Sequence, residues 1–219
     1  DEDDSPAAQP DQAITRSVEV LVVILLSIAT VTTAWSAYQA TRWSGTQAIN
    51  AGQADALRAE STKWSDRANS LSIVDVQLFT AWVAATGDDD TVRSDFLLER
   101  FRDEFRPAFD AWLASVPNPR RTIPEGTPFD RPEYQLAARA ESERLSEEAA
   151  DHVAASREAN QTGDNFILVT VLFASVLFFA GTVVKLRSRN IRSMLLVLAS
   201  VVWVAGVTIM LILPQNVGF

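Results

Sequence analysis

The apolar residues of this chain gather in three long runs, and the charged residues lie before and between them. Two of these runs, at 166–184 and 193–213, contain no charged residue. Each is close to the ~20 residues that a helix needs to cross a hydrocarbon core of ~30 Å. A short basic segment separates them, so the pattern predicts a transmembrane hairpin.

A third run, at 18–38, predicts one more transmembrane helix ahead of the hairpin. Its polar and small residues recur at helical spacing and form one stripe: Glu19, Ser27, Thr30, Thr33 and Ala37. Lipid is an unfavourable environment for such a stripe, so we expect it to face other helices or water. One interpretation is a pore wall around which several copies meet. The other is a packing surface for small residues of the hairpin: Ala174, Gly181, Ala199 and Gly206.

Glu19 has two interpretations of its own. A carboxylate well inside a bilayer costs about 2.5–3.5 kcal/mol on insertion scales, and such groups often serve ion or proton movement. In a pore, Glu19 would form a carboxylate ring at the mouth. The alternative places it at the level of the lipid headgroups, beside Arg16, which lies one turn earlier.

The region between the first run and the hairpin has helical patterns throughout. No proline occurs between 40 and 86, and apolar residues recur there at three, four and seven positions: Trp64, Leu71, Val74, Leu78 and Trp82. This spacing is typical of an amphipathic helix. We therefore expect the first transmembrane helix to continue outward as one long helix, with a bend at Gly45 or Gly52.

A second amphipathic helix is expected from Thr91, after the segment Gly-Asp-Asp-Asp at 87–90. The three acids could suggest calcium, but they lack the alternating ligands of an EF-hand loop, so we interpret them as a helix cap. The expected buried side of this helix is rich in aromatic residues: Val92, Phe96, Leu97, Phe101, Phe105, Phe109, Trp112 and Leu113. Pro107 should kink or split it.

Four prolines between 116 and 129 predict a long loop. A third helix should begin after it, with Asp130 as N-cap and Pro132 in the first turn, and run to about Gln161. The expected apolar side of this helix is thin: Leu136, Ala140, Leu145, Ala149, Val153 and Ser156. Gly163 and Asp164 should break or bend it.

The basic segment of the hairpin orients these elements. It carries four cations within eight residues: Lys185, Arg187, Arg189 and Arg192. Short loops rich in Lys and Arg stay in the cytoplasm, which places the N-terminus inside and both the 40–164 region and the C-terminus outside. The same turn could bind anionic lipid headgroups. A cleavage site of the small-x-small type occurs at Ala34-Trp35-Ser36, but the acidic N-terminal residues are atypical of a secretory signal, so we expect an uncleaved anchor.

These expectations give an all-α, three-span integral membrane protein with an extracytoplasmic domain of antiparallel helices. The expected segments are a disordered acidic tail at 1–13, transmembrane helix 1 at 14–39, the extracytoplasmic domain at 40–164, transmembrane helix 2 at 165–185, a basic cytoplasmic turn at 186–192, transmembrane helix 3 at 193–214 and an extracytoplasmic C-terminus at 215–219.

Charge and composition exclude several kinds of function. The net charge is −9, and 22 of the 28 acids against 14 of the 19 basic residues lie between Thr41 and Asp164. An acidic chain of this kind does not favour nucleic acid as a partner. There is no cysteine and one histidine, His152, which we interpret as a solvated or packing residue rather than a ligand. We therefore expect no catalytic residue, no cofactor, no metal site and no enzymatic activity.

Several motifs carry a resemblance. They are Ala-Trp-Ser-Ala-Tyr-Gln-Ala at 34–40, Arg-Pro-Ala-Phe-Asp-Ala-Trp-Leu at 106–113, Asn-Pro at 118–119, Pro-Glu-Tyr at 132–134 and the apolar run at 170–181. With them the chain resembles a group of uncharacterised bacterial inner-membrane proteins with three spans. The resemblance implies a prokaryotic cell membrane and a topology, and it supplies no activity.

Two functions follow as hypotheses. The first is a non-enzymatic membrane scaffold or accessory subunit, since one chain with so thin an apolar third helix should assemble as a homo-oligomer or join a larger complex in the bilayer. The second is a homo-oligomeric ion channel lined by the first transmembrane helix. The direction of Glu19 and the oligomeric state distinguish them.

Overall fold

The computed structural model describes residues 10–115, 124–186 and 188–217, with side chains from residue 19 onward. Within these ranges the chain forms helices and no strand, which confirms the all-α prediction. The elements are α1 (Pro10–Gly87), α2 (Thr91–Leu98), α3 (Arg106–Leu113), the 3₁₀ turn η1 (Pro128–Asp130), α4 (Ala137–Val183) and α5 (Arg189–Ile212). Residues 1–9 of the predicted acidic tail, the centre of the proline-rich loop and Arg187 lie outside the described residues. Residues 10–13 belong to α1, so the prediction of a disordered tail is wrong for them.

Three of the helices are long and apolar enough to cross a membrane: α1, α4 and α5. This supports a multi-pass membrane protein with the three expected spans. As expected from the lack of proline, α1 continues without interruption for 78 residues. Helix α4, of 47 residues, likewise contains a polar, charged segment followed by most of the apolar run at 166–184.

The chain divides into two compact units. In the described chain, unit 1 comprises α1 up to Ala51, α4 from Ala154, and α5 with the residues that follow it. Unit 2 is Gly52–Val153, which contains the rest of α1, α2, α3, η1 and the start of α4.

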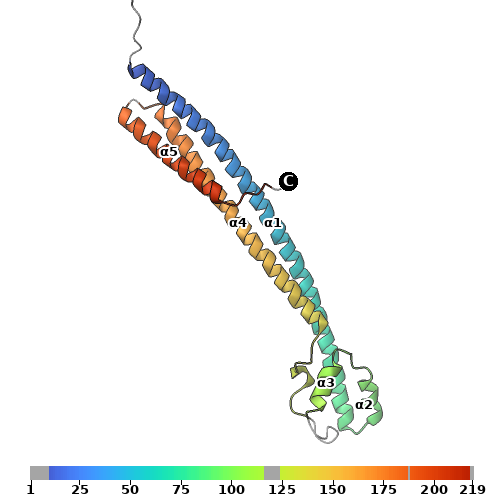
Figure 1. Cartoon of the computed structure of the whole chain (residues 1–219). Coiled ribbons are helices and arrows are strands. Elements are labelled where there is room, and N and C mark those ends of the chain that lie inside the picture. The colour runs from blue at the N-terminus through green and yellow to red at the C-terminus, as the bar shows by residue number, and fades with distance from the viewer. Residues whose placement is uncertain (1–9, 116–123, 187, 218–219) are drawn as a thin grey trace, which may run out of the picture. The chain divides into compact units, whose positions relative to one another are not determined.

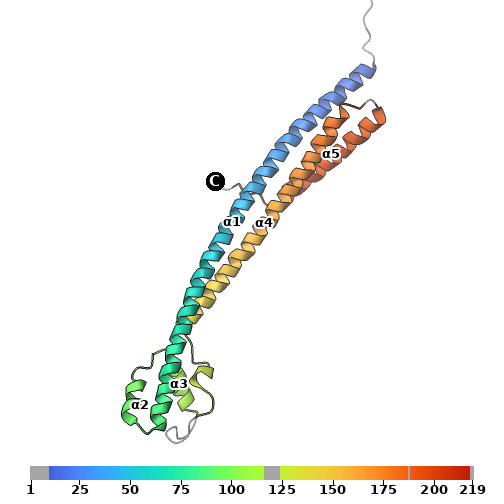
Figure 2. The same ribbon diagram turned by 180° about the vertical axis from the view of Figure 1, so that it is seen from behind.

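In unit 1 the helices α1, α4 and α5 lie side by side, as both views show (Figures 1 and 2). Val22 of α1 packs with Val183 of α4 and Leu196 of α5, and two turns further Ala29 packs with Val176 and Ala199. The buried residues of α4 recur every three or four positions: Phe166, Val169, Phe173, Val176, Ala180 and Val183. This is the spacing of a helix seam in a bundle.

Two glycines allow close helix contacts in unit 1. A Cβ on Gly206 of α5 would lie 2.7 Å from the Phe173 ring of α4, and a Cβ on Gly163 of α4 would lie 3.6 Å from the carbonyl oxygen of Ala40. Helix α4 runs from Ala137 to Val183 without interruption, so the predicted break at Gly163 is wrong. A Cβ at Gly163 would make only an ordinary van der Waals contact, so a side chain is excluded at Gly206 and not at Gly163.

The core of unit 2 is aromatic. Phe79 and Trp82 of α1 meet Phe109 and Trp112 of α3, together with Phe101 and Phe105 from the linker before α3. The Trp82 and Phe109 rings lie edge to face with centroids 4.9 Å apart, a geometry that aromatic quadrupoles favour. The predicted burial of Phe101, Phe105, Phe109 and Trp112 is confirmed.

The segment between Thr91 and Leu113 is split into two short helices, which is one of the two predicted outcomes. The split lies before Pro107, which is in the first turn of α3. This position suits proline because the first turn needs no N–H donor within the helix. Val92 and Phe96 of α2 are exposed, since the short helix presents only its other side to the core.

The start of the third predicted helix also differs. Asp130 caps η1, where its Oδ2 accepts hydrogen bonds from the backbone N–H and the Oγ1 hydroxyl of Thr127, at 3.1 and 2.8 Å. Helix α4 begins later, at Ala137, so Pro132 and Glu133 belong to the connection. The prediction of Asp130 as the N-cap of the third helix is wrong, because Thr127 is the N-cap of η1 and Asp130 completes its capping box from the third position.

Candidate functional site

The helix face that packs in unit 1 is not the predicted stripe of α1. Val22, Ala29, Ser36 and Gln39 are the buried positions, whereas Glu19, Ser27 and Thr30 are exposed and Thr33 is partly buried. Of the small residues proposed as contacts, Ala199 and Gly206 are buried, and Ala174 and Gly181 are exposed. The hairpin thus packs beside the stripe and leaves most of it free within one chain.

The exposed stripe extends further than the sequence analysis followed it. Small residues at alternating spacings of three and four continue along α1, and each is exposed: Ser27, Thr30, Ala34, Ala37, Thr41, Ser44 and Ala48. We call these seven residues the small-residue face. No side chain in it is charged or larger than threonine. It is the spacing at which one helix packs against another.

Three of the four hydroxyl groups of this face are already bonded within α1. Ser27 and Thr30 donate to the backbone carbonyl oxygens of Val23 and Leu26, both at 2.8 Å, and Thr41 donates to Ala37 at 3.1 Å. Side chains bonded in this way need no water to satisfy them. From Ser27 to Thr41 the face can therefore meet lipid or another helix without a free polar group.

A polar clamp that the sequence analysis missed joins the end of α5 to α1. The backbone N–H of Asn216 donates to Gln39 Oε1 at 2.9 Å, and Asn216 Nδ2 donates to Thr46 Oγ1 at 3.0 Å. The indole N–H groups of Trp35 and Trp43 donate to Gln215 Oε1 and to the Pro214 carbonyl oxygen, both at 3.1 Å. The segment after α5 is thereby held on α1 rather than left as a simple tail.

The clamp explains why a polar side chain lies in the helix seam. Gln39 is fully buried, as is Ser36 one turn earlier. A buried amide without a partner costs free energy, and the Asn216 bond offsets part of that cost for Gln39. The aromatic residues at this end of the span match the expected position of an interfacial belt.

A shallow polar hollow of ≈ 530 Å³ also lies in unit 1. Four of its lining residues are uncharged and two carry opposite charges: Gln47, Ser156, Asn160 and Gln161, with Arg157 and Asp164. Asn160 Nδ2 donates to Asp164 Oδ2 at 3.0 Å, and Ser156 donates to the Gln47 carbonyl oxygen at 3.1 Å. These two bonds satisfy the side chains of Asn160, Asp164 and Ser156 from within the lining, and the hollow is an open polar surface between α1 and α4.

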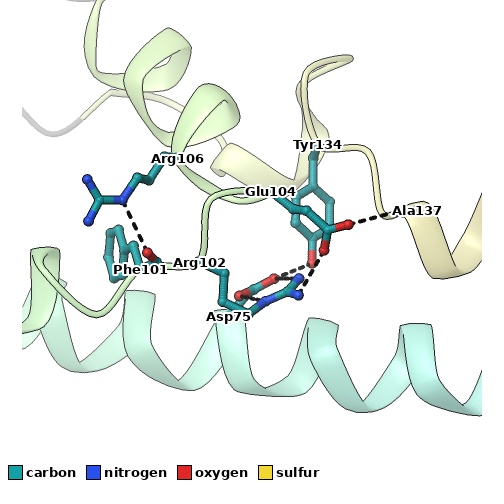
Figure 3. Close-up of polar contacts among 7 residues, drawn as sticks. All are labelled: Asp75, Phe101, Arg102, Glu104, Arg106, Tyr134 and Ala137. Carbon is teal, nitrogen blue, oxygen red and sulfur yellow. Dashed lines mark hydrogen bonds and ion pairs between the residues drawn. The ribbon is translucent and has the colours of Figure 1, made fainter.

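Unit 2 contains a buried carboxylate, Asp75, within an ionic network (Figure 3). Arg102 binds it through two nitrogens, with Nε to Oδ1 at 2.9 Å and Nη2 to Oδ2 at 3.0 Å. The Tyr134 hydroxyl donates to Asp75 Oδ2 at 3.1 Å. This bidentate geometry is the strongest form of a charge-assisted hydrogen bond, and it compensates for the burial of the carboxylate.

Glu104 extends the network to the start of α4. Its Oε2 accepts from Arg102 Nη1 at 2.8 Å, and its Oε1 accepts from the backbone N–H of Ala137 at 3.0 Å, as Figure 3 shows. A carboxylate at a helix N-terminus satisfies a free N–H and complements the helix dipole. The network therefore connects α1, the linker before α3 and the start of α4 within unit 2.

The network changes two pKa values. Burial, with the charge of Asp75, raises the pKa of the Tyr134 phenol above its usual 10.0, while a hydrogen bond with Ser72 and the charge of Arg102 oppose the shift. The hydrogen bond to Asp75 raises the pKa of the Arg102 guanidinium above its already high usual value, against a smaller opposite effect of burial. Tyr134 and Arg102 both stay protonated at neutral pH. The network therefore stabilises the structure, and neither group exchanges a proton there.

The remaining sequence candidates lie apart from one another. The side chain of Asp90 accepts from the backbone N–H of Arg93 at 3.0 Å, which confirms the predicted helix cap. His152 is partly buried on α4. Among the described residues, no three His, Asp or Glu side chains form a group that could hold a metal ion.

The basic turn keeps three described cations at one end of unit 1. Lys185 and Arg189 are exposed and Arg192 is partly buried. All ion pairs found in the described part of the chain involve residues of unit 2, so none of these three cations is paired with a described acid.

Comparisons of this chain with protein-family models, curated proteins and solved structures found no significant match.

Proposed function

We propose that this chain is a non-enzymatic membrane scaffold or accessory subunit that assembles through the small-residue face of α1. The observation that supports the proposal is that all seven residues of the small-residue face, from Ser27 to Ala48, are exposed. Small residues let helix backbones approach closely, which is the main source of helix association in a bilayer. The occupant of the face is a second copy of α1, with a subunit of a larger membrane complex as the alternative.

The topology of the proposal follows the positive-inside rule. The basic turn lies in the cytoplasm of a prokaryotic cell and unit 2 lies outside the inner membrane, with the C-terminus on the same side. In this arrangement α1 and α4 run antiparallel. The contacts of unit 1 support this direction, because Val22 of α1 packs with Val183 of α4 and, further along α1, Ala29 packs with the earlier residue Val176.

A bulky residue on the small-residue face tests the assembly. Ala37→Leu should lower the oligomer to a monomer, or weaken it at least tenfold, because the added side chain prevents close approach of a second helix. The matched control is Ala174→Leu, an exposed alanine of α4 outside the face. The measurement is the protein mass of the detergent complex from light scattering. A monomeric native chain that also captures no partner from its own membrane would refute the proposal.

The channel hypothesis makes a different use of the same stripe. Glu19 is exposed at the end of α1, with no ion pair to a described residue, as a pore-lining carboxylate would be. The internal hydrogen bonds of Ser27 and Thr30 favour the scaffold, since a pore wall would offer its hydroxyls to water and ions. Ion flux in liposomes that falls on Glu19→Gln would favour the channel and overturn the scaffold.

A further inference from the structure

The last part of α1, in unit 2, has a surface unlike the rest of that unit. Unit 2 carries 20 of the 28 acids and 12 of the 19 basic residues of the chain, a composition typical of a water-facing domain. Between Arg67 and Asp88, however, Asp75 is the only charged residue. Asp75 is fully buried and paired with Arg102. The exposed side of α1 therefore carries no charge over about five helical turns.

Large apolar side chains are exposed on this stretch. Ile73 is 58% exposed and Val76 is 43% exposed. They belong to a set of exposed, uncharged residues at spacings of three and four, which share one face of α1: Asn69, Ile73, Val76, Thr80 and Ala84. We call these five residues the uncharged face. Lipid accounts for exposed apolar residues in the three spans, whereas adjoining apolar residues on a water-facing unit mark an interaction surface.

The polar residues of the uncharged face are compatible with burial. Thr80 Oγ1 donates to the Val76 carbonyl oxygen at 2.8 Å, so its hydroxyl is already satisfied within α1. Asn69 has an amide, which contains both a donor and an acceptor and can therefore pair with an identical amide. An asparagine pair of this kind also fixes the alignment of two identical helices.

The lack of charge indicates which partner this face binds. Unit 2 has a net charge of −8, so a basic partner would be attracted to its acids, and the uncharged face would contribute nothing to selecting it. Two copies of unit 2 repel each other overall, and they can meet closely only through a surface without charge. The centres of protein interfaces are depleted in charged residues for this reason.

The symmetry of such a contact agrees with the residues present. Copies inserted in one membrane have the same orientation, so a two-fold contact places α1 parallel to α1 with identical residues opposed. Charged residues at these positions would oppose like charges, whereas Ile73 and Val76 can pack against their own counterparts. We propose that the uncharged face binds the uncharged face of a second copy of this chain, with Ile73 and Val76 at its centre.

This contact rests on the proposed function in one respect, because its partner is the same second copy. It uses different residues, since the uncharged face belongs to unit 2 and the small-residue face to unit 1. The two contacts can therefore be tested separately in the full chain.

Single cysteines locate the contact. Ile73→Cys and Val76→Cys are introduced into the full chain, which has no other cysteine, and are oxidised in the native membrane. Because a two-fold contact opposes identical residues, each should give about fivefold more cross-linked dimer than Val74→Cys. Val74 is the matched control, since it is exposed to 43%, as Val76 is, and lies about 160° around the helix from it.

A charge on the face tests whether the contact stabilises the assembly. Ile73→Glu should weaken self-association about tenfold, because two carboxylates would be opposed, whereas Val74→Glu should change it less than about twofold. The measurement is light scattering of the detergent complex over a range of protein concentrations. Both residues are exposed, so thermal unfolding of the two variants should agree.

Three results would overturn the proposal: equal cross-linking of Ile73→Cys, Val76→Cys and Val74→Cys, no cross-linked product from any of them, or equal association of Ile73→Glu and Val74→Glu. The failure of the proposed assembly gives a different result. Cross-links at 73 and 76 without any between 27 and 48 would refute the contact through the small-residue face alone, and the reverse pattern would refute the contact through the uncharged face alone.

Discussion

The backbone N–H of Asn216 donates a hydrogen bond to the side-chain carbonyl of Gln39 at 2.9 Å, across 177 positions of sequence. Gln39 is fully buried in the seam of unit 1, so this bond fixes the segment after α5 to the side of α1. It is the contact by which the last transmembrane helix of the chain is tied to the first.

Removal of this acceptor should destabilise unit 1. Gln39→Ala leaves the Asn216 N–H without its acceptor, and a lost buried hydrogen bond of this kind costs about 1–3 kcal/mol. The free energy of unfolding in mixed detergent, followed by tryptophan fluorescence, should fall by that amount. Gln53→Ala changes an exposed glutamine of the same helix and serves as control. Equal stability of both variants would show that the clamp does not contribute.

The Asp75 network should be the most sensitive polar contact of unit 2. Arg102→Gln leaves a fully buried carboxylate without its cation, and a broken buried ion pair costs about 3–5 kcal/mol. Adding Asp75→Asn should recover part of the loss, since the unpaired charge is then gone. The measurement is thermal unfolding of the full chain. Arg144→Gln, which breaks pairs with exposed Glu141 and Glu148, should have a much smaller effect.

Tyr134 gives a pH dependence whose sign is determined by its raised pKa. The folded state holds the phenolic proton more tightly than the unfolded chain does. The stabilisation is therefore complete below pH 10 and is lost as the pH rises through the folded-state pKa. Tyr134→Phe should remove this loss and give a flatter melting temperature between about pH 9.5 and 11. A slope unchanged by the substitution would contradict the assigned environment.

Two glycines of the transmembrane helices form a matched pair. Gly206→Ala places a methyl group 2.7 Å from the Phe173 ring, and overpacking of this kind costs about 1–3 kcal/mol. Gly181→Ala meets nothing within 4 Å and should be neutral or stabilise its helix by up to about 1 kcal/mol. Detergent unfolding of the two variants measures the difference. A larger loss at Gly181 would contradict the packing of α4 against α5.

The features that could be predicted are those with a local cause. The lengths of the apolar runs predicted three spanning helices, the absence of proline predicted the continuity of α1, and Asp90 was identified as a cap three residues before the N–H that it accepts from. The errors arose where tertiary contacts prevailed. Glycine is typical of a helix break, but α4 continues through Gly163 and lies against α1 there. The sequence around Pro107 did not show at which residue the first short helix would end and α3 would begin.

The contacts of the candidate sites could not be predicted, because their partners are far apart in sequence. Nothing near Asn216 indicates Gln39, and nothing near Asp75 indicates Arg102 or Tyr134. The polar stripe of α1 was visible from its spacing, but the face that packs on the hairpin is a neighbouring one, centred on Val22 and Ala29. Helical periodicity predicts which residues share one face of a helix, but it does not predict which other helix packs against that face.

The proposed assembly through the small-residue face of α1 is tested most directly by disulfide scanning. The chain has no cysteine, so single cysteines can be placed at each position from 27 to 48 and oxidised in the native membrane. We expect cross-linked dimers with maxima at Ser27, Thr30, Ala34, Ala37 and Thr41, which repeat every three or four positions. Maxima instead at exposed residues of the other side, such as Ile28 and Val31, or no cross-linked product at any position, would contradict the proposed assembly.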